Sequence, residues 1–205
     1  GLRLLGYTLL GYAVAGAWNP RLYAMNTLAL VSLLLFFGAY GNYWDWRLHG
    51  ESNGTQGAMT RWRLNDLQGL AVCLMPLGIA GAALWAARQA GLSGASLGWL
   101  ALAFGLGLAY IGPQLRLKTR IGGLLTTPIV AAVLFLQGYT AASHPLSLSV
   151  MLFCGLLALF QCQAEVLHLL DDRLHGQEHP PYIEASRLAA WLRRLPRVAF
   201  WGSLG

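Results

Sequence analysis

Two stretches of the sequence combine carboxylates, histidines and an amide at helical spacing, and such side chains bind metal ions and phosphates. Each stretch places three of them at positions i, i+3 and i+7: Asn42, Asp45 and His49 in the first, and Glu165, His168 and Asp172 in the second. On a helix, residues at this spacing lie above one another on one face. The spacing therefore predicts two polar helix faces, each with an acid and a histidine four residues apart.

A simpler explanation of both stretches is that they only close the ends of helices. Polar residues at helix ends often act as caps or reach from apolar surroundings to water. Two observations favour a site instead: the spacing is repeated on separate helices, and Glu165 lies about one turn inside the apolar run. An ionisable group in that position is costly and is usually functional.

A third polar stretch begins at Tyr110 and carries cations at alternate positions after Pro113, namely Arg116, Lys118 and Arg120. In an extended segment, alternate side chains point to the same side. These cations would then lie together on one side of the segment. The alternative is that they only set the orientation of the chain in a membrane, which needs cations but no particular spacing.

The composition decides which elements position these residues. Of the 205 residues, 56% are hydrophobic and 11% are charged, whereas soluble domains contain about 25% charged residues. So few charges cannot cover the surface of a soluble enzyme, and the apolar content excludes disorder. The uncharged runs are long enough to cross a bilayer, which takes about 20 residues as a helix. We therefore predict an all-α integral membrane protein built as a multi-helix bundle.

We expect one transmembrane domain over residues 1–205, with spans at residues 2–17, 22–43, 67–87, 94–112, 122–141 and 147–170. An amphipathic segment at 182–195 is expected to lie in the headgroup region of the bilayer. A partial seventh span follows at 197–205. Because the first and last spans are short and the chain begins with Gly1, we expect a truncated chain.

The charged residues are distributed unevenly between the two sides of the predicted bundle. Of the 14 lysines and arginines, only Arg21 and Arg88 fall on one side, and all 8 acids fall on the other. By the positive-inside rule the charged side is cytoplasmic. We therefore expect a multi-pass protein of a bacterial inner membrane, with its amino terminus and its polar site on the cytoplasmic side.

The order of these features resembles the UbiA superfamily of intramembrane prenyltransferases, nine-helix bundles with aspartate-rich motifs after helices two and six. The segment 42–49 resembles the first motif, NDxxDxxxD, and the segment 165–176 resembles the second, NxxxDxxxDxxxG, with a slip of one residue. The stretch 110–118 is similar to the YSxPPLRLK sequence of chlorophyll-synthase-like and other aromatic prenyltransferases. The resemblance covers the whole chain, as helices one to six and the start of seven.

The resemblance implies a fold of the UbiA prenyltransferase type, with Mg²⁺ at the two motifs and Asp45 and Asp172 as catalytic carboxylates. The metal ligands that it implies are Asn42, Asp45, Glu165, His168 and Asp172. The residues that it implies for the diphosphate are His49, Arg47, Arg116 and Lys118, and those for the prenyl cavity are Tyr43, Tyr110 and Tyr139. The implied partners are a prenyl diphosphate, a lipophilic acceptor (aromatic or isoprenoid) and membrane lipid, without nucleic acid.

The two motifs depart from the family pattern at three positions. The family has Asp where His49 and His168 stand, and usually Asn where Glu165 stands. Mg²⁺ prefers oxygen ligands, whereas histidine suits Zn, Mn or Fe better. Three consequences stay open: a weaker metal site, a protonated histidine that contacts the phosphate directly, or the loss of catalysis.

Other functions are compatible with the same residues. A UbiA-type terpene cyclase would use the cavity without an acceptor. A membrane oxidase with a histidine-bound metal is indicated by His168, Asp172, His175 and His179, although the repeated histidine pairs of a di-iron site are missing. A catalytically degenerate protein that binds lipid or assists assembly is the third alternative, since aspartates of both motifs are replaced.

Overall fold

The computed structural model describes residues 2–16, 19–49, 66–112 and 121–174, although the side chains at 2, 45–49, 66, 121–124 and 167–174 are outside that description. Over these ranges the chain forms six α-helices. They are α1 (Leu2–Ala15), α2 (Pro20–His49), α4 (Asp66–Gln89), α5 (Gly94–Ile111), α6 (Ile121–Tyr139) and α7 (Leu148–Leu174). The predicted segments at 182–195 and 197–205 lie outside the described residues.

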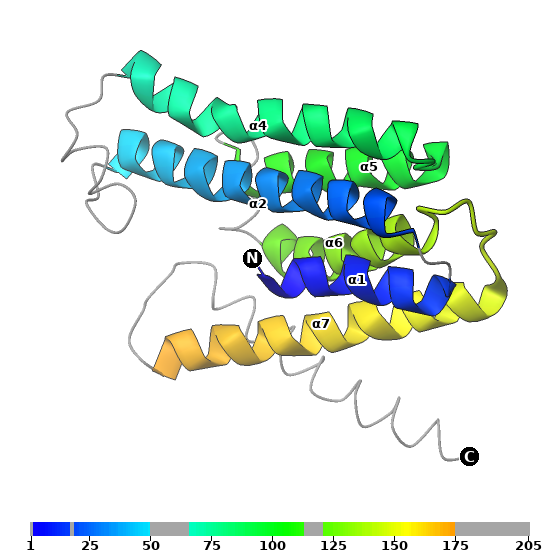
Figure 1. The fold of residues 1–205 in the computed structure, drawn as a ribbon. Helices are drawn as coiled ribbons and strands as arrows, with labels where there is room; N and C mark the ends of the chain where they lie inside the picture. Colours follow the sequence, from blue (N-terminus) through cyan, green and yellow to red (C-terminus); the bar gives the residue numbers. More distant parts are fainter. Residues whose placement is uncertain (1, 17–18, 50–65, 113–120, 175–205) are drawn as a thin grey trace.

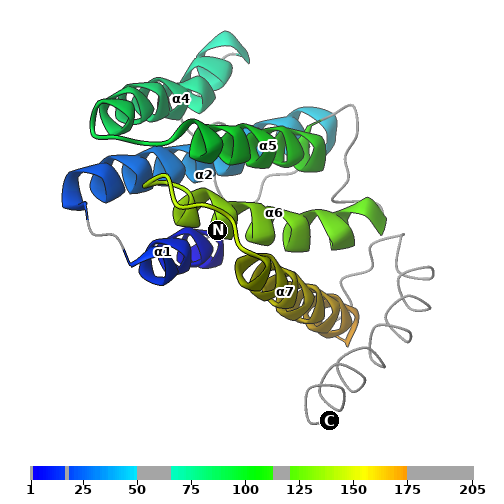
Figure 2. The same cartoon turned by 90° about the vertical axis from the view of Figure 1, so that its right-hand side faces the viewer.

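Consecutive helices run in opposite directions, so the bundle has two distinct ends (Figure 1). Helix α2 packs along α4, and α1 packs along α6. Helix α6 also contacts α5 on one side and α7 on the other (Figure 2). The carboxyl ends of α2, α5 and α7 and the amino ends of α1, α4 and α6 therefore lie at one end of the bundle, which we call the charged end.

The helix ends at the opposite side follow from local sequence. Gly16 and Gly91 have φ angles of +70° and +101°, a conformation that glycine adopts without strain at the end of a helix. Helix α2 begins with Pro20, and the side chain of Asn19 caps it by accepting a hydrogen bond of 3.1 Å from the Leu22 N–H. The Ser93 hydroxyl caps α5 by accepting a bond of 3.0 Å from the Ser96 N–H. These turns return each helix to the charged end.

The outward faces of the bundle are apolar. Four helical segments are long and apolar enough to cross a bilayer: Pro20–Trp44, Leu67–Gln89, Gly94–Ile111 and Leu148–Val166. Large hydrophobic side chains on these segments are well exposed, among them Leu35, Met75, Trp85, Leu152 and Phe160. Surfaces of this kind are stable against lipid and unfavourable against water. The protein is therefore an integral membrane protein.

Helices α1 and α6 cross at two glycines. A Cβ atom at Gly138 would lie 2.1 Å from the Thr8 carbonyl oxygen, and one at Gly11 would lie 2.3 Å from the Phe135 carbonyl oxygen. Only glycine leaves room for two backbones at this separation, as is common where membrane helices pack. The crossing holds α1 against α6 (Figure 1).

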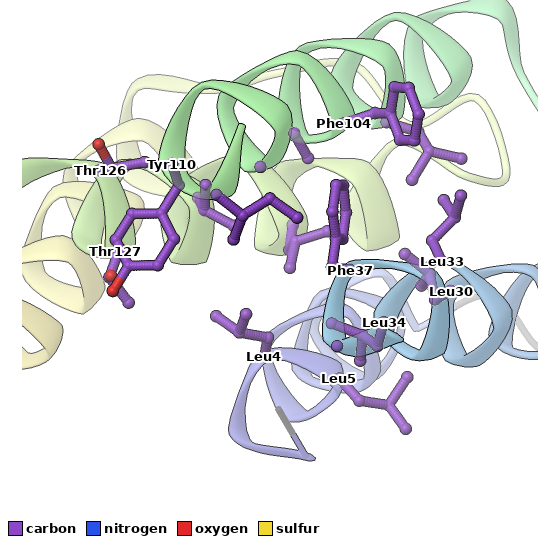
Figure 3. Close-up of a pocket in the computed structure, with 17 residues that line it drawn as sticks. Leu4, Leu5, Leu30, Leu33, Leu34, Phe37, Phe104, Tyr110, Thr126 and Thr127 are labelled. Atoms are coloured by element: carbon purple, nitrogen blue, oxygen red, sulfur yellow. The ribbon is translucent and has the colours of Figure 1, made fainter. Parts of the chain in front are cut away.

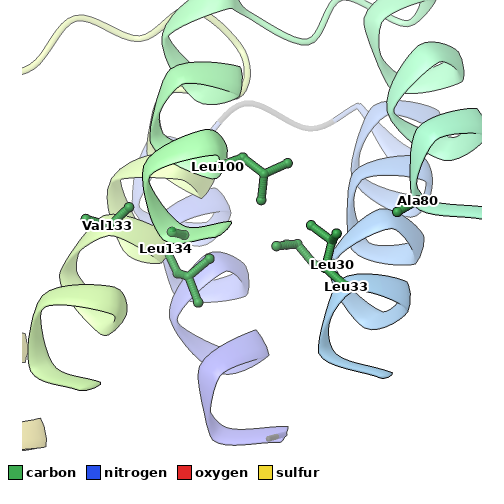
Figure 4. Close-up of a cluster of buried hydrophobic side chains, with 7 residues drawn as sticks. Leu30, Leu33, Ala80, Leu100, Val133 and Leu134 are labelled. Carbon is green, nitrogen blue, oxygen red and sulfur yellow. The ribbon is translucent and has the colours of Figure 1, made fainter. Parts of the chain in front are cut away.

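The interior contains an apolar layer and a polar layer. Leu30 of α2, Leu100 of α5 and Leu134 of α6, which we call the leucine layer, are buried and belong to one core cluster (Figure 4). One turn further from the charged end, the same helices contribute Asn26, Ser96 and Gln137, all fully buried. Together with Tyr12 of α1, these three residues form what we call the polar layer.

Candidate active site at the charged end of the bundle

The two polar stretches lie on continuous helices that end on the same side of the molecule. Helix α2 extends through His49 and carries the first stretch, and α7 extends to Leu174 and carries the second. Figure 1 shows both carboxyl ends at the charged end of the bundle. Asp45, Arg47, His49, His168 and Asp172 lie on these helices, with their side chains outside the described part. Arg116 and Lys118 lie outside the described residues.

Glu165 is the acid of the second stretch whose side chain is described, and it is held by neighbours from two helices. Its Oε1 accepts a hydrogen bond of 2.7 Å from Gln161 Nε2, one turn earlier on α7. Gln161 Oε1 in turn accepts a bond of 2.6 Å from the Tyr7 hydroxyl of α1. Arg3 Nη2 lies 4.0 Å from Glu165 Oε1, and the Glu165 side chain is 16% exposed. The carboxylate is therefore kept within the bundle by a hydrogen-bonded chain from α1.

The oxygen donors at the charged end are of the kind that Mg²⁺ binds. Asn42, half-buried on α2, and Glu165 offer an amide and a carboxylate oxygen within the described part. Mg²⁺ in proteins usually takes one or two carboxylates and completes its shell with water and substrate phosphate. Among the side chains that the structure describes, no three His, Cys, Asp or Glu residues gather closely enough to hold a metal by themselves. The residue types fit Mg²⁺ if phosphate oxygens complete the site.

An apolar cavity of about 310 Å³ lies between α1, α2, α5 and α6 (Figure 3). Its polar groups are Tyr110, Thr126 and Thr127, which we call the polar rim, at the ends of α5 and α6 nearest the charged end. Tyr110 shares a hydrogen bond with Thr127 and lies near enough to Glu165 for an electrostatic interaction. The rim is therefore the polar part of the cavity, at the end of the bundle that carries the second polar stretch.

Aromatic rings form much of the cavity wall beyond the rim. Phe37 of α2 and Phe104 of α5 both line the cavity, with ring centres 5.4 Å apart. Phe37 fits closely against α5, because a Cβ atom at Gly107 would lie 2.5 Å from its ring. Ring faces of this kind attract cations. The wall thus offers apolar contact to a hydrocarbon and stabilisation to a positive charge formed on it.

Of the three tyrosines that the sequence places at a prenyl cavity, Tyr110 lines this one. Tyr43 is buried elsewhere, in a cluster with Cys73 between α2 and α4. Tyr139 is at the opposite end of α6, stacked on Phe135 and beside His144. Both are interfacial aromatic residues whose sequence positions gave no information on the direction of the ring.

Several residues at the site were not anticipated from the sequence. Gln161 precedes Glu165 by four residues, which is one helical turn. The same spacing, followed one turn further towards the amino terminus, would therefore have predicted it. Tyr7 and Arg3 reach the site only through the position of α1. Phe37 and Phe104 lie in uniformly apolar runs, where no signal separates a cavity wall from a lipid face.

The structure is similar to a solved protein. It matches the structure of a UbiA homologue from Archaeoglobus fulgidus bound to GPP and Mg²⁺ with a TM-score of 0.66 and 17% sequence identity. The match covers 96% of this chain and 72% of that chain. No protein-family model and no curated protein matches the sequence. The chain therefore has the UbiA fold, which confirms the fold class that its two motifs and its predicted spans indicate.

Proposed function

We propose that the protein is an intramembrane prenyltransferase, which moves a prenyl group from a prenyl diphosphate to an apolar acceptor, aromatic or isoprenoid. The observation that carries the proposal is the apolar cavity beneath a charged end with two acidic helix stretches. This arrangement suits an amphiphile with a diphosphate at one end and a hydrocarbon tail at the other. The similarity to a homologue bound to GPP and Mg²⁺ supports the same assignment.

In this proposal Asn42, Asp45, Glu165, His168 and Asp172 hold Mg²⁺, with Asp45 and Asp172 as the principal carboxylates. When bound, Mg²⁺ neutralises the charge that develops on the departing diphosphate. Gln161 and Tyr7 hold the Glu165 carboxylate in place through the bonds described above. The chain from α1 therefore fixes one member of the ligand set before substrate arrives.

Arg47, His49, Arg116 and Lys118 are proposed to bind the diphosphate oxygens. Arginine and lysine form short, charge-assisted hydrogen bonds to phosphate, and a protonated histidine donates in the same way. These bonds hold the headgroup as the bond between the prenyl carbon and the diphosphate oxygen breaks, with its electron pair going to the diphosphate. Tyr110 lies at the rim, where the reacting carbon would sit.

The tail and the allylic cation are proposed to occupy the cavity. Its walls exclude water, which would otherwise capture the cation, and Phe37 and Phe104 present rings to the charge. The acceptor forms a new bond to the allylic carbon and then loses a proton. Because the outward faces are apolar, we propose that the acceptor arrives from the bilayer, in an inner membrane of bacterial type with the site on the cytoplasmic side.

Diphosphate release from prenyl diphosphates by the purified protein tests the proposal. With Mg²⁺ and an aromatic or isoprenoid acceptor, we expect diphosphate and a prenylated product. Asp45→Ala and Asp172→Ala are each expected to abolish diphosphate binding without lowering the melting temperature. Diphosphate release with a cyclised product and no prenylated acceptor would support a terpene cyclase. Binding retained in both variants would contradict the assignment of the site.

A further inference from the structure

The cavity ends at the leucine layer. Along α5 its lining runs from Ile111 at the charged end to Leu100, which is about 16 Å of helix at 1.5 Å per residue. On α2 and α6 the last lining residues are Leu30 and Leu134. The three leucines are at most 5% exposed and point into the space between their helices (Figure 4). They close the cavity at its inner end.

The layer behind these leucines is polar and closely bonded. Gln137 Nε2 donates hydrogen bonds of 3.0 Å to Asn26 Oδ1 and to Ser96 Oγ. The Ser96 hydroxyl donates to the Gln137 carbonyl oxygen at 2.9 Å. Asn26 Nδ2 donates to the Tyr12 hydroxyl. The polar layer thus joins α1, α2, α5 and α6 in one network directly behind the leucine layer.

A hydrocarbon that reached the polar layer would separate these hydrogen bonds. Buried polar groups without partners are strongly unfavourable. Gln137 Oε1 already has no hydrogen-bond partner in the described part of the chain, so the network has little capacity to rearrange around an apolar intruder. The leucine layer is consequently a fixed floor, since the core behind it cannot accept a longer tail by simple repacking.

We propose that Leu30, Leu100 and Leu134 set the upper limit on prenyl tail length, so that the protein selects short prenyl diphosphates. The inference rests on the proposed function, because it assigns the tail to the cavity. The cavity volume of about 310 Å³ is at the lower end of the range of small-molecule sites, about 300–1,000 Å³. Geranyl and farnesyl tails are accommodated, whereas the last isoprene unit of a geranylgeranyl tail meets the floor.

The test is a binding series on the full chain in detergent with Mg²⁺, using geranyl, farnesyl and geranylgeranyl diphosphates and reading thermal stabilisation against ligand concentration. When a pocket has no room for one extra methylene group, binding weakens about tenfold or more. Geranylgeranyl diphosphate is therefore expected to bind at least about tenfold more weakly than farnesyl diphosphate. Leu100→Ala opens the floor and should remove most of this difference. Leu134→Ala provides the same test from α6 if Leu100→Ala fails to fold.

Leu102→Ala is the matched control, because Leu102 is on the same helix but faces outward, with 46% exposure. Its tail preference should equal that of the wild type. Equal affinity of the wild-type protein for all three diphosphates, or an unchanged preference in both floor variants, would overturn the inference and leave the proposed function standing. Failure to bind any of the three diphosphates would remove the proposed function and the inference together.

Discussion

Replacing Gly138 by alanine tests the crossing that holds α1 against α6. In an ordinary helix, Gly→Ala is stabilising by about 0.8–1.0 kcal/mol. At Gly138 the new methyl group would lie 2.1 Å from the Thr8 carbonyl oxygen and 3.0 Å from the Thr8 Cα. Both are backbone atoms, which cannot rotate away as the end of a flexible side chain can. Helix α1 must therefore move.

The magnitude follows from the cost of overpacking. Forcing a methyl group into a closely packed contact costs about 1–3 kcal/mol, and the backbone contacts place Gly138→Ala at the upper end. After the gain in helix propensity is subtracted, about 2 kcal/mol of destabilisation remains. In a chain of this size that lowers the melting temperature by roughly 4–8 °C. Mg²⁺-dependent diphosphate release should fall as well, because α1 carries the Tyr7 bond to Gln161.

The assay is thermal unfolding of the purified variants in one detergent. Gly6→Ala is the control, because Gly6 is on α1 and no described atom outside its own helix backbone and chain neighbours lies within 4 Å of its added Cβ. That variant should be as stable as the wild type or slightly more stable. A melting temperature of Gly138→Ala equal to that of Gly6→Ala would refute the close crossing and the position of α1 derived from it.

Three further outcomes concern the site. His49→Asp, which introduces the aspartate of the UbiA motif that residues 42–49 resemble, should strengthen the dependence on Mg²⁺; an unchanged Mg²⁺ titration would place His49 away from the metal. Tyr7→Phe removes the hydroxyl that donates a hydrogen bond to Gln161, which costs about 1 kcal/mol and should raise the midpoint of the Mg²⁺ titration about fivefold. Tyr23→Phe serves as a control, because Tyr23 is remote from Glu165. Equal midpoints in the two variants would show that the hydrogen-bonded chain from α1 does not position the carboxylate. Chelation of Mg²⁺ should stop diphosphate release and excess Mg²⁺ should restore it, whereas release that persists in chelator would exclude the metal from the reaction.

The gaps between charges predict helices, because a membrane helix needs an uninterrupted apolar run and little else. The sequence singles out Asn42 and Glu165 as polar residues at helical spacing. The stretches that contain them lie on the continuous helices α2 and α7. Helix periodicity alone predicts which polar residues share a helix face, because that prediction needs no knowledge of tertiary contacts.

The interior could not be predicted in the same way. In water an apolar stripe marks the core, but here lipid and core favour the same residues, so the lipid-exposed Leu102 and the buried Leu100 are equivalent in sequence. The position of Tyr139 away from the cavity and the bond from Tyr7 to Gln161 both depend on which helices are neighbours. The approach of Gly11 to Phe135 likewise depends on the α1–α6 pairing.

An experimental structure of the full chain with geranyl diphosphate and Mg²⁺ tests the central claim most directly. We expect the diphosphate at the charged end, with Mg²⁺ about 2.0–2.1 Å from carboxylate oxygens of Asp45 and Asp172, and the tail in the cavity lined by Phe37 and Phe104, above the leucine layer. Asp45 and Asp172 on opposite flanks of the bundle, facing lipid or separated by packed side chains, would contradict the account.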